Sequence, residues 1–458
     1  MKKNTEIKPN DPKEIFGWLM YDWANSVFFT TVVGVLIGQY ITVLAQKAVG
    51  ENGVVFSLGG YDLVTAKSLF SYSVGLSVFL QIFFLPIMGA IADYTHLKKT
   101  FMAFFCYLGA FACCLLFFIE GNLYVLGSIF FIVANLSAGA SIVFYNSFLN
   151  DITTEDRRDK VSSWGFAAGY ASGFLVLLGN LIFLNNAESI GVSTGMAVRI
   201  CLLTAGLWWG VFAFVTFSLL KTRQPMRDVP KGKNYISAGI GELIETFREL
   251  FRLKNTLSFL IAYLLYNDGI QTVITGSAIF ISQELFVAKG LEVDNTVLII
   301  AFLIAQFIGF FGALAFEKIA NLTNSKNAII ISLLIWSVIV IYAYGFLYTV
   351  TQAYVMSGFI GFVLGGSQAL SRSLFSQMIP AGRESSFFGI YEISERGTSW
   401  IGPVIFGFVA QMTDSYRPAI LALIVFFILG SIILFFTDTA KAIHEAGNLT
   451  PEEAAILE

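Results

Sequence analysis

Long apolar runs follow one another along most of this chain, and short polar segments separate them. About twelve of the runs are long enough for a membrane-spanning helix, which needs roughly 20 mostly apolar residues. The predicted spans are residues 16–45, 68–92, 100–119, 123–149, 162–184, 198–220, 256–285, 295–316, 328–347, 352–376, 387–410 and 417–437. The pattern predicts an all-α polytopic membrane protein with about 12 transmembrane helices.

The longest polar connection, residues 221–254, has a different pattern. From Ile240 to Phe251 apolar residues recur three or four positions apart, with charged residues between them. This spacing predicts an amphipathic helix that lies on the inner membrane interface. We favour a plain tether as its role, with regulation as the alternative.

Composition supports lipid as the solvent of this chain. Hydrophobic residues make up 56% of it and charged residues only 13%, whereas soluble domains carry about 25% charged residues. The four cysteines, Cys106, Cys113, Cys114 and Cys201, all fall in apolar runs, where a packing role is expected. We therefore expect no disulfide, no metal site, no cofactor and no nucleic-acid partner.

The placement of basic residues predicts the orientation in the membrane. With both termini on the cytoplasmic side, the inner segments hold 21 of the 28 lysines and arginines, as the positive-inside rule requires. A bacterial inner (plasma) membrane is the expected location, with a vacuole-type membrane as the alternative.

Two stretches half a chain apart resemble each other. Gly139-Ala140-Ser141 with Asn146-Ser147 matches Gly365-Gly366-Ser367 with Arg372-Ser373 at a constant offset of 226 residues. An internal repeat of this size is typical of duplicated transporters. We predict an N-terminal six-helix half (1–220), a cytoplasmic linker (221–254), a parallel-related C-terminal six-helix half (255–437) and a cytoplasmic tail (438–458).

One inner loop carries a family signature. Gly89-Ala-Ile-Ala-Asp93-Tyr-Thr-His-Leu-Lys98-Lys99 resembles the major facilitator signature Gly-x-Leu-Ala-Asp-Arg-x-Gly-Arg-Lys, although Tyr94 and His96 replace the usual Arg and Gly. The resemblance implies that Asp93, Lys98 and Lys99 latch the inner gate to the neighbouring half. The alternative is a simple turn with positive-inside charges.

Three further motifs are similar to one branch of that superfamily. Tyr21-Asp22-Trp23-Ala24-Asn25-Ser26, Tyr266-Asn267-Asp268-Gly269 and Gln368-Ala369-Leu370-Ser371-Arg372-Ser373 resemble the vacuole-effluxer-like, or "unknown major facilitator", family. The likeness extends from Trp18 to about Phe436. It implies a transporter that works by alternating access, and eukaryotic members are linked to amino-acid efflux from the vacuole.

Several charges fall inside predicted spans: Asp22, Asp268, Glu392, Glu395, Arg372 and Arg396. Each costs about 2.5–3.5 kcal/mol in a spanning helix unless it pairs, takes up a proton or faces water. Glu392 and Arg396 are four residues apart, which favours a pair within one helix. Arg372 is expected either to snorkel to the inner interface or to reach Glu395 on the next span.

Asp22 and Asp268 have no obvious partner in the sequence. A carboxylate buried without a partner takes up a proton readily, so we expect at least one of the four acids to carry a proton during transport. Asp268 is about 13 residues into its helix and therefore near the membrane centre, which makes it the better candidate. The alternative is a static hydrogen bond to a neighbouring helix.

Polar side chains accompany these acids on the first and seventh spans. Where these spans meet they are expected to line a polar, substrate-binding cavity, to which two further residues contribute; the set is Tyr21, Asn25, Tyr266, Asn267, Gln271, Asn146 and Gln368. Hydrogen bonding between helices is the alternative role for each of them. Gly165, Gly169 and Gly173 predict close helix packing, and Gly402-Pro403 predicts a kink.

The sequence thus predicts a secondary active transporter for a small polar or zwitterionic solute, with amino acids first and protons as the coupling ion. The alternatives are an uncoupled facilitator and a non-transporting sensor on a transporter fold. The chain lacks a Walker motif, a His-Glu-x-x-His motif and a Cys/His nucleophile pair, so we expect no enzyme. The solute, protons and the lipid bilayer are the expected partners of a monomeric chain.

Overall fold

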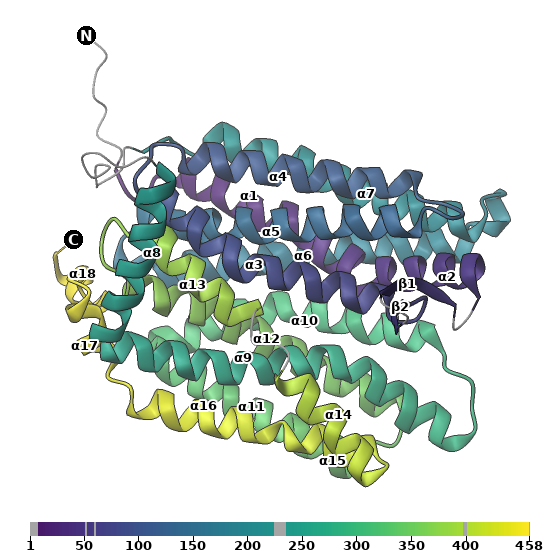
Figure 1. Cartoon of the computed structure of the whole chain (residues 1–458). Helices are drawn as coiled ribbons and strands as arrows, with labels where there is room; N and C mark the ends of the chain where they lie inside the picture. The colour runs from purple at the N-terminus through teal and green to yellow at the C-terminus, as the bar shows by residue number, and fades with distance from the viewer. Residues whose placement is uncertain (1–7, 51–52, 59–60, 224–234, 397–400, 458) are drawn as a thin grey trace.

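The computed structural model describes residues 8–50, 53–58, 61–223, 235–396 and 401–457. Long helices run side by side along one direction, and the start of α1 and the end of α18 lie at the same end of the bundle (Figure 1). Following the charge bias, we call that end the inner end. Eleven described helices are long and apolar enough to cross a membrane.

Seven α-helices and a π-helical segment build the N-terminal half. They are α1 (Pro12–Val27), η1 (Phe28–Leu36), α2 (Ile37–Val49), α3 (Leu69–Asp93), α4 (Lys98–Leu115), α5 (Tyr124–Ile152), α6 (Arg158–Asn186) and α7 (Thr194–Leu219). The first three elements form one continuous helix from Pro12 to Val49. Asp11 caps α1 and Pro12 opens it, the combination that favours a helix start.

The remaining long helices follow the linker and form the predicted C-terminal half. Its helices are α9 (Lys254–Ile281), α10 (Asn295–Leu322), α11 (Ser325–Phe346), α12 (Val350–Gln377), α13 (Glu384–Arg396), α14 (Ile401–Thr413), α15 (Tyr416–Ala422) and α16 (Ile424–Phe436). Short helical turns are η2 (Leu116–Phe118), η3 (Glu155–Arg157), η4 (Glu188–Ile190), η5 (Ser282–Phe286) and η6 (Val287–Lys289). The prediction of an all-α protein with about 12 spans is confirmed.

The described residues of the predicted eleventh span fall in two helices, α13 and α14. Residues 397–400 lie outside the described part of the chain. The predicted kink at Gly402-Pro403 therefore lies at the start of α14. Near the start of α14 the backbone N–H of Gly402 donates a hydrogen bond to a carboxylate.

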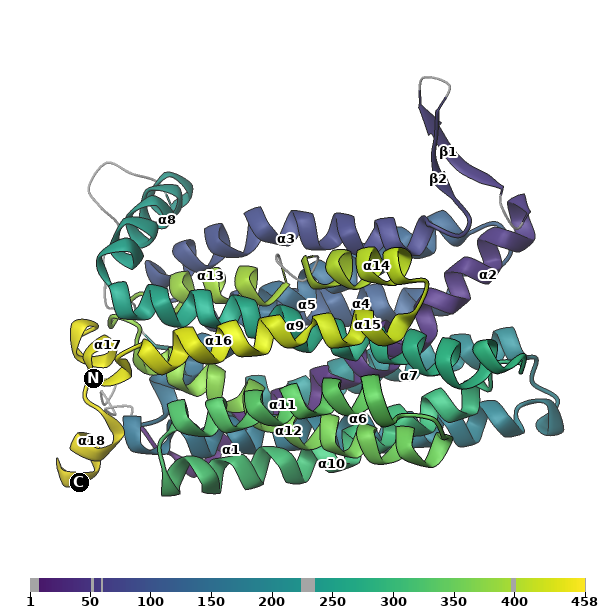
Figure 2. The same cartoon turned by 90° about the horizontal axis from the view of Figure 1, so that it is seen from below.

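The first outer connection holds a β-hairpin that the sequence analysis did not predict. Strands β1 (Val54–Leu58) and β2 (Tyr61–Thr65) pair antiparallel. Figure 2 shows the hairpin projecting at the end opposite to the chain termini. Alternating Val, Phe and Leu residues before a Gly-Gly dipeptide are a hairpin signal.

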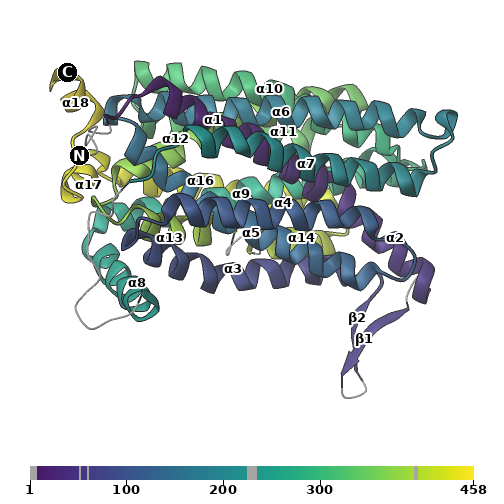
Figure 3. The same cartoon turned by 90° about the horizontal axis from the view of Figure 1, so that it is seen from above.

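The predicted linker helix is present as α8 (Tyr235–Arg252). It runs across the inner ends of the spans at the edge of the bundle, beside α3 (Figures 1 and 3). Two short helices, α17 (Thr439–Glu445) and α18 (Pro451–Leu457), lie at the same end. The first linker residues are anchored to α1, because Arg223 contacts the buried Glu14 carboxylate at 2.6 Å.

Small residues set the closest helix contacts. As predicted, Gly165, Gly169 and Gly173 of α6 pack directly against side chains of α1 and its π-helical extension. In the C-terminal half, α10 and α12 approach so closely that a β-carbon at Gly361 would overlap the Ala305 carbonyl. Both seams therefore depend on the absence of a side chain.

Gly361→Val is expected to lower the free energy of unfolding by about 1–3 kcal/mol or more, because backbone atoms and not a flexible side chain must move. Thermal denaturation of the purified protein in detergent measures this. Gly179→Val is the matched control, since a β-carbon there has no neighbour within 4 Å. Equal losses in the two variants would contradict the packing account.

Candidate functional site

A buried ion pair joins the two halves. Arg372 of α12 and Asp22 of α1 lie 3.3 Å apart, Nη1 to Oδ2, and their residues are 3% and 8% exposed. The prediction that Arg372 snorkels to the inner interface is wrong, and so is the prediction that Asp22 lacks a partner; the alternative contact with Glu395 lies outside the described side chains. The guanidinium points into the bundle because its partner lies there, and burial makes the pair mutually dependent.

Further hydrogen bonds hold both members of the pair. Arg372 donates from Nε to the Ser162 hydroxyl and from Nη2 to the Ser162 carbonyl, both at 2.9 Å. Tyr145 donates its hydroxyl to Asp22 Oδ2 at 2.6 Å. Asp22, Tyr145 and Ser162 belong to the N-terminal half. Residues of that half therefore hold the side chain of an arginine that belongs to the C-terminal half.

Aromatic rings surround the guanidinium. Its carbon lies 4.2 Å from the ring centre of Phe166 and 4.8 Å from that of Trp18, and Trp18 stacks on Tyr145. Cation–π attraction of this kind strengthens when water is excluded. A β-carbon on Gly165 would approach both charged groups closely, so a glycine there leaves room for the pair.

Asn146 links this pair to a second buried acid. Its Nδ2 donates to Glu392 Oε1 of α13 at 2.9 Å, and its Oδ1 accepts from Arg372 at 3.4 Å. Glu392 is fully buried. The predicted partner of Glu392 is Arg396, but the side chains of Glu395 and Arg396 lie outside the described residues, so that pair stays a prediction.

The other predicted substrate-binding residues divide into two groups. Gln368 lies between the halves, where its Oε1 accepts from the Tyr170 hydroxyl at 2.8 Å. Tyr21 packs within its own half, against Tyr145 and Phe217, and Tyr266 shares a hydrogen bond with Ser371 of its own half. Asn25 and Asn267 are buried and Gln271 is half-buried. The structure thus brings Asn146 and Gln368 to the interface but turns both tyrosines away from it.

Asp268 caps the start of α14. Its Oδ2 accepts from the backbone N–H of Gly402 at 2.8 Å, which is the favourable position for a carboxylate at a helix N-terminus. The prediction that Asp268 has no partner is therefore wrong for one oxygen. The other oxygen, Oδ1, is buried and has no hydrogen-bond partner in the described part of the chain.

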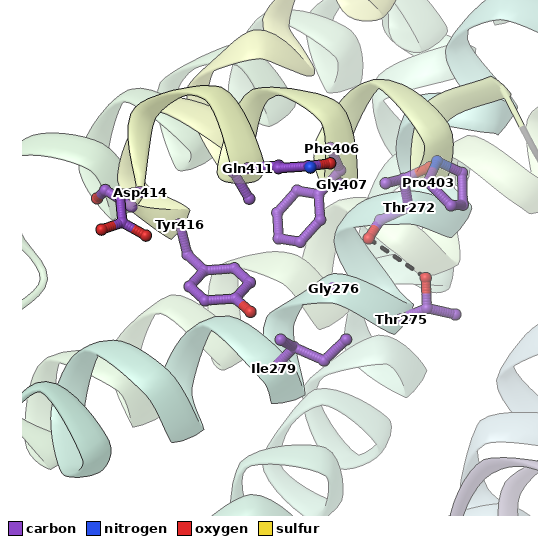
Figure 4. Close-up of a pocket in the computed structure, with 12 residues that line it drawn as sticks. Thr272, Thr275, Gly276, Ile279, Pro403, Phe406, Gly407, Gln411, Asp414 and Tyr416 are labelled. Atoms are coloured by element: carbon purple, nitrogen blue, oxygen red, sulfur yellow. Dashed lines mark hydrogen bonds between the residues drawn. The ribbon is translucent and has the colours of Figure 1, made fainter. Parts of the chain in front are cut away.

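A pocket of about 520 Å³ opens one helical turn from Asp268. It lies between α9, α14 and α15, and Figure 4 shows Thr272, Thr275, Gln411 and Tyr416 around it. The Thr272 hydroxyl donates to the Asp268 carbonyl at 2.7 Å. All its lining residues belong to the C-terminal half, so it is separate from the Asp22–Arg372 pair.

Asp93 closes the inner end between the halves. Its carboxylate accepts from the backbone N–H groups of Ser385 and Ser386 at 2.9 and 2.8 Å and from the Ser386 hydroxyl at 2.5 Å. An acid of α3 thus caps α13 of the other half. Lys98 instead pairs with Asp151, and Lys99 donates to the Leu220 carbonyl. Both of these contacts lie within the N-terminal half, but Lys98 also interacts electrostatically with Glu384 of the C-terminal half, so a latching role for Lys98 stays a prediction.

Further hydrogen bonds continue the closure. Asn150 donates to the Ser376 carbonyl at 2.7 Å, and the Asp159 carboxylate accepts from the hydroxyls of Ser325 and Ser373, each at 2.5 Å. Together with the Asp93 and Arg372 contacts they seal the halves from the inner end towards the membrane centre. The structure is therefore closed on its inner side.

Asp93→Asn is expected to weaken this closure by about 1–2 kcal/mol, because an amide has one acceptor oxygen where the carboxylate has two. The measurement is the labelling rate of Ser147→Cys, a buried position, by an impermeant thiol reagent added to the inner face of a variant without native cysteines. Faster labelling is the expected result. Asp438→Asn, at the N-cap of α17, is the matched control, and equal rates in all variants would refute the latch.

Sequence reasoning missed Tyr145, Ser162 and Phe166, yet one signal pointed to the site. The internal repeat aligns Asn146 with Arg372 at an offset of 226. In the structure these two residues touch, and so do Asn150 and Ser376, which have the same offset. Equivalent positions of two related halves meet where the pseudo-two-fold axis passes between them, so the repeat itself marked the interface.

Comparisons with known proteins agree with this architecture. The family model described as vacuole effluxer Atg22 like matches residues 10–447. The MFS-type transporter YxiO of Bacillus subtilis (strain 168) is 28% identical over 443 residues, covering 96% of this chain and 98% of that protein. Autophagy-related protein 22 of Coccidioides immitis (strain RS) is 27% identical, covering 97% and 89%.

Solved structures show the same fold at low sequence identity. The human organic anion transporter MFSD10 superposes with a TM-score of 0.69 at 13% identity, over 93% of this chain and all of that one. The proton:xylose symporter XylE gives a TM-score of 0.66 at 13% identity, over 98% and 99%. Both are major facilitator transporters.

Proposed function

The chain belongs to the vacuole effluxer Atg22-like family, and from this premise we propose that it is a proton-coupled secondary transporter of a small zwitterionic solute, amino acids first. As a member of this family it is a multi-pass major facilitator transporter and not an enzyme. The substrate class, the coupling ion and a bacterial plasma-membrane location with cytoplasmic termini are our proposals.

The observation that carries the substrate class is the Asp22–Arg372 pair. The two halves contribute opposite charges, 3.3 Å apart, inside a cage of aromatic rings. Alternating access requires the halves to separate here, and separation would leave each charge buried without a partner, at a cost of about 3–5 kcal/mol. A zwitterion removes that cost, because its carboxylate replaces Asp22 beside Arg372 and its ammonium replaces Arg372 beside Asp22.

Neighbouring groups fit the same solute. The Tyr145 hydroxyl and the Asn146 amide lie within hydrogen-bond distance of the pair, and they provide further polar contacts for an α-amino and an α-carboxyl group. Trp18 and Phe166 offer apolar surface for a side chain. An uncharged sugar would leave both charges unpaired, which is the least favourable occupant of such a site.

Two buried acids other than Asp22 support the proposal of proton coupling. Glu392 is fully buried and is bonded to the Asn146 amide. Asp268 is fully buried with one oxygen unpartnered in the described chain. Buried acids inside a membrane protein are suited to taking up and releasing a proton during transport.

The test uses the purified chain in proteoliposomes that contain a pH-sensitive dye. Pools of amino acids, peptides and sugars are added in turn, and both labelled-solute flux and internal pH are recorded. We expect one amino-acid pool to give solute uptake with a proton signal that empty liposomes lack. Uptake of sugars but of no amino acid would overturn the substrate class, and solute flux without a proton signal would overturn the coupling.

A further inference from the structure

The linker helix α8 is held against the bundle by its acidic side. Arg383, in the connection between α12 and α13, lies 3.3 Å from Glu242 and 3.0 Å from Glu245 and also contacts Glu249. Glu242 accepts a hydrogen bond from Tyr94 at the end of α3 as well. The three acids of α8 are therefore already paired with groups of the two halves.

The opposite side of α8 is apolar and uncovered. Ile244, Phe247 and Phe251 are 50%, 39% and 67% exposed, and their spacing of three and four residues puts them in one stripe. The helix crosses the inner ends of the spans at the edge of the bundle (Figures 1 and 2). A membrane protein has the headgroup region of the inner leaflet at that place, so the stripe meets lipid.

Two arginines lie between the apolar stripe and the acids. Arg248 and Arg252 are four residues apart on one face, are exposed, and make no hydrogen bond or ion pair with any described residue. Together with Arg383 they line a pocket of about 520 Å³, whose other charged groups are Glu245 and Glu249. The lining thus carries three arginines against two glutamates, and of these arginines only Arg383 forms an ion pair with a described residue; Arg248 and Arg252 are therefore available to a ligand.

We propose that this pocket binds the phosphate headgroup of an anionic phospholipid of the inner leaflet. Arg248 and Arg252 bind the phosphate, and the acyl chains lie along Ile244 and Phe251. Free phosphate shares the headgroup chemistry, but the adjoining apolar stripe favours a lipid because it contributes burial only to a ligand with acyl chains. The inference does not depend on the identity of the transported solute.

The test measures lipid binding to the full chain, purified in detergent and depleted of lipid. Native mass spectrometry counts the molecules of phosphatidylglycerol and of phosphatidylcholine retained at matched concentrations. Wild type is expected to retain phosphatidylglycerol selectively. Arg248→Gln/Arg252→Gln is expected to bind it roughly 30-fold more weakly, since each basic residue at the surface contributes about fivefold.

Matched variants separate this site from general surface charge. Lys160→Gln/Lys318→Gln removes two exposed inner-end cations far from α8 in sequence and is expected to bind as wild type. Arg248→Lys/Arg252→Lys keeps the charges and should retain most of the binding. Size-exclusion profiles show that the variants are folded, so a loss confined to Arg248→Gln/Arg252→Gln supports the site.

Two results would overturn the proposal. One is equal retention of phosphatidylglycerol by wild type and by Arg248→Gln/Arg252→Gln. The other is displacement of the lipid by soluble glycerol phosphate at matched concentration, because the acyl chains would then contribute nothing.

Discussion

Arg372→Gln is expected to abolish solute transport and to lower the free energy of unfolding by about 3–5 kcal/mol. The change leaves Asp22, which is 8% exposed, without the guanidinium that neutralises it. It also removes four further hydrogen bonds that Arg372 donates: two to Ser162, one to Asn146 and a second one to Asp22. Thermal and denaturant unfolding in detergent measure the stability, and labelled-solute uptake in proteoliposomes measures the transport.

Two further variants distinguish the charge pair from a loss of packing. Asp22→Asn/Arg372→Gln removes both charges, so it should regain most of the stability while transport stays absent, because a zwitterion then finds no partner. Arg199→Gln is the matched control: its partner Glu120 is 65% exposed, and we expect a loss below about 1 kcal/mol. Wild-type uptake by Arg372→Gln would contradict the proposed role of the pair.

Asp268→Asn is expected to eliminate the solute-dependent proton flux while leaving the protein folded. The asparagine oxygen can still accept the Gly402 N–H bond that Asp268 accepts at 2.8 Å, but an amide cannot carry a proton. The dye-loaded proteoliposomes measure the proton flux, and labelled solute measures net transport in parallel. The expected loss of the proton signal is complete, within the sensitivity of the dye.

The control for this variant is an acid outside the membrane interior. Asp294→Asn replaces the N-cap of α10, an exposed residue, and should leave both signals unchanged. If Asp268→Asn retains the wild-type proton signal, the proton carrier lies elsewhere, with Glu392 the next candidate. If wild type and Asp268→Asn show equal solute flux and neither shows a proton signal, the protein is an uncoupled facilitator.

Hydrophobic periodicity was sufficient to predict the spans, because lipid requires long apolar helices whatever their tertiary contacts. The pairing of the buried charges was not predictable in the same way. Local spacing favoured Glu392 with Arg396, four residues apart, whereas Arg372 found Asp22 at a separation of 350 residues. Contacts between halves depend on how two bundles dock, and no short-range pattern contains that information.

The contacts at the inner end were also predictable only in part. The family signature singled out Asp93 correctly as a contact to the other half, but its partners are backbone groups and a hydroxyl at the start of α13. Backbone donors at a helix start leave little trace in a sequence beyond residues such as Ser385 and Ser386. Lys99 shares the motif with Asp93, yet its side chain binds the Leu220 carbonyl of its own half.

The central claim is that the two halves separate at their inner ends in each transport cycle, and a reversible cross-link tests it most directly. Ser147 and Ser385 belong to different halves, are fully buried and lie 3.2 Å apart, Oγ to Oγ. Ser147→Cys/Ser385→Cys in a variant without native cysteines can therefore be joined by oxidation and released by a reductant. Our account predicts that solute transport stops on oxidation and returns on reduction, with each single variant unaffected. Undiminished transport by the fully cross-linked protein would contradict it.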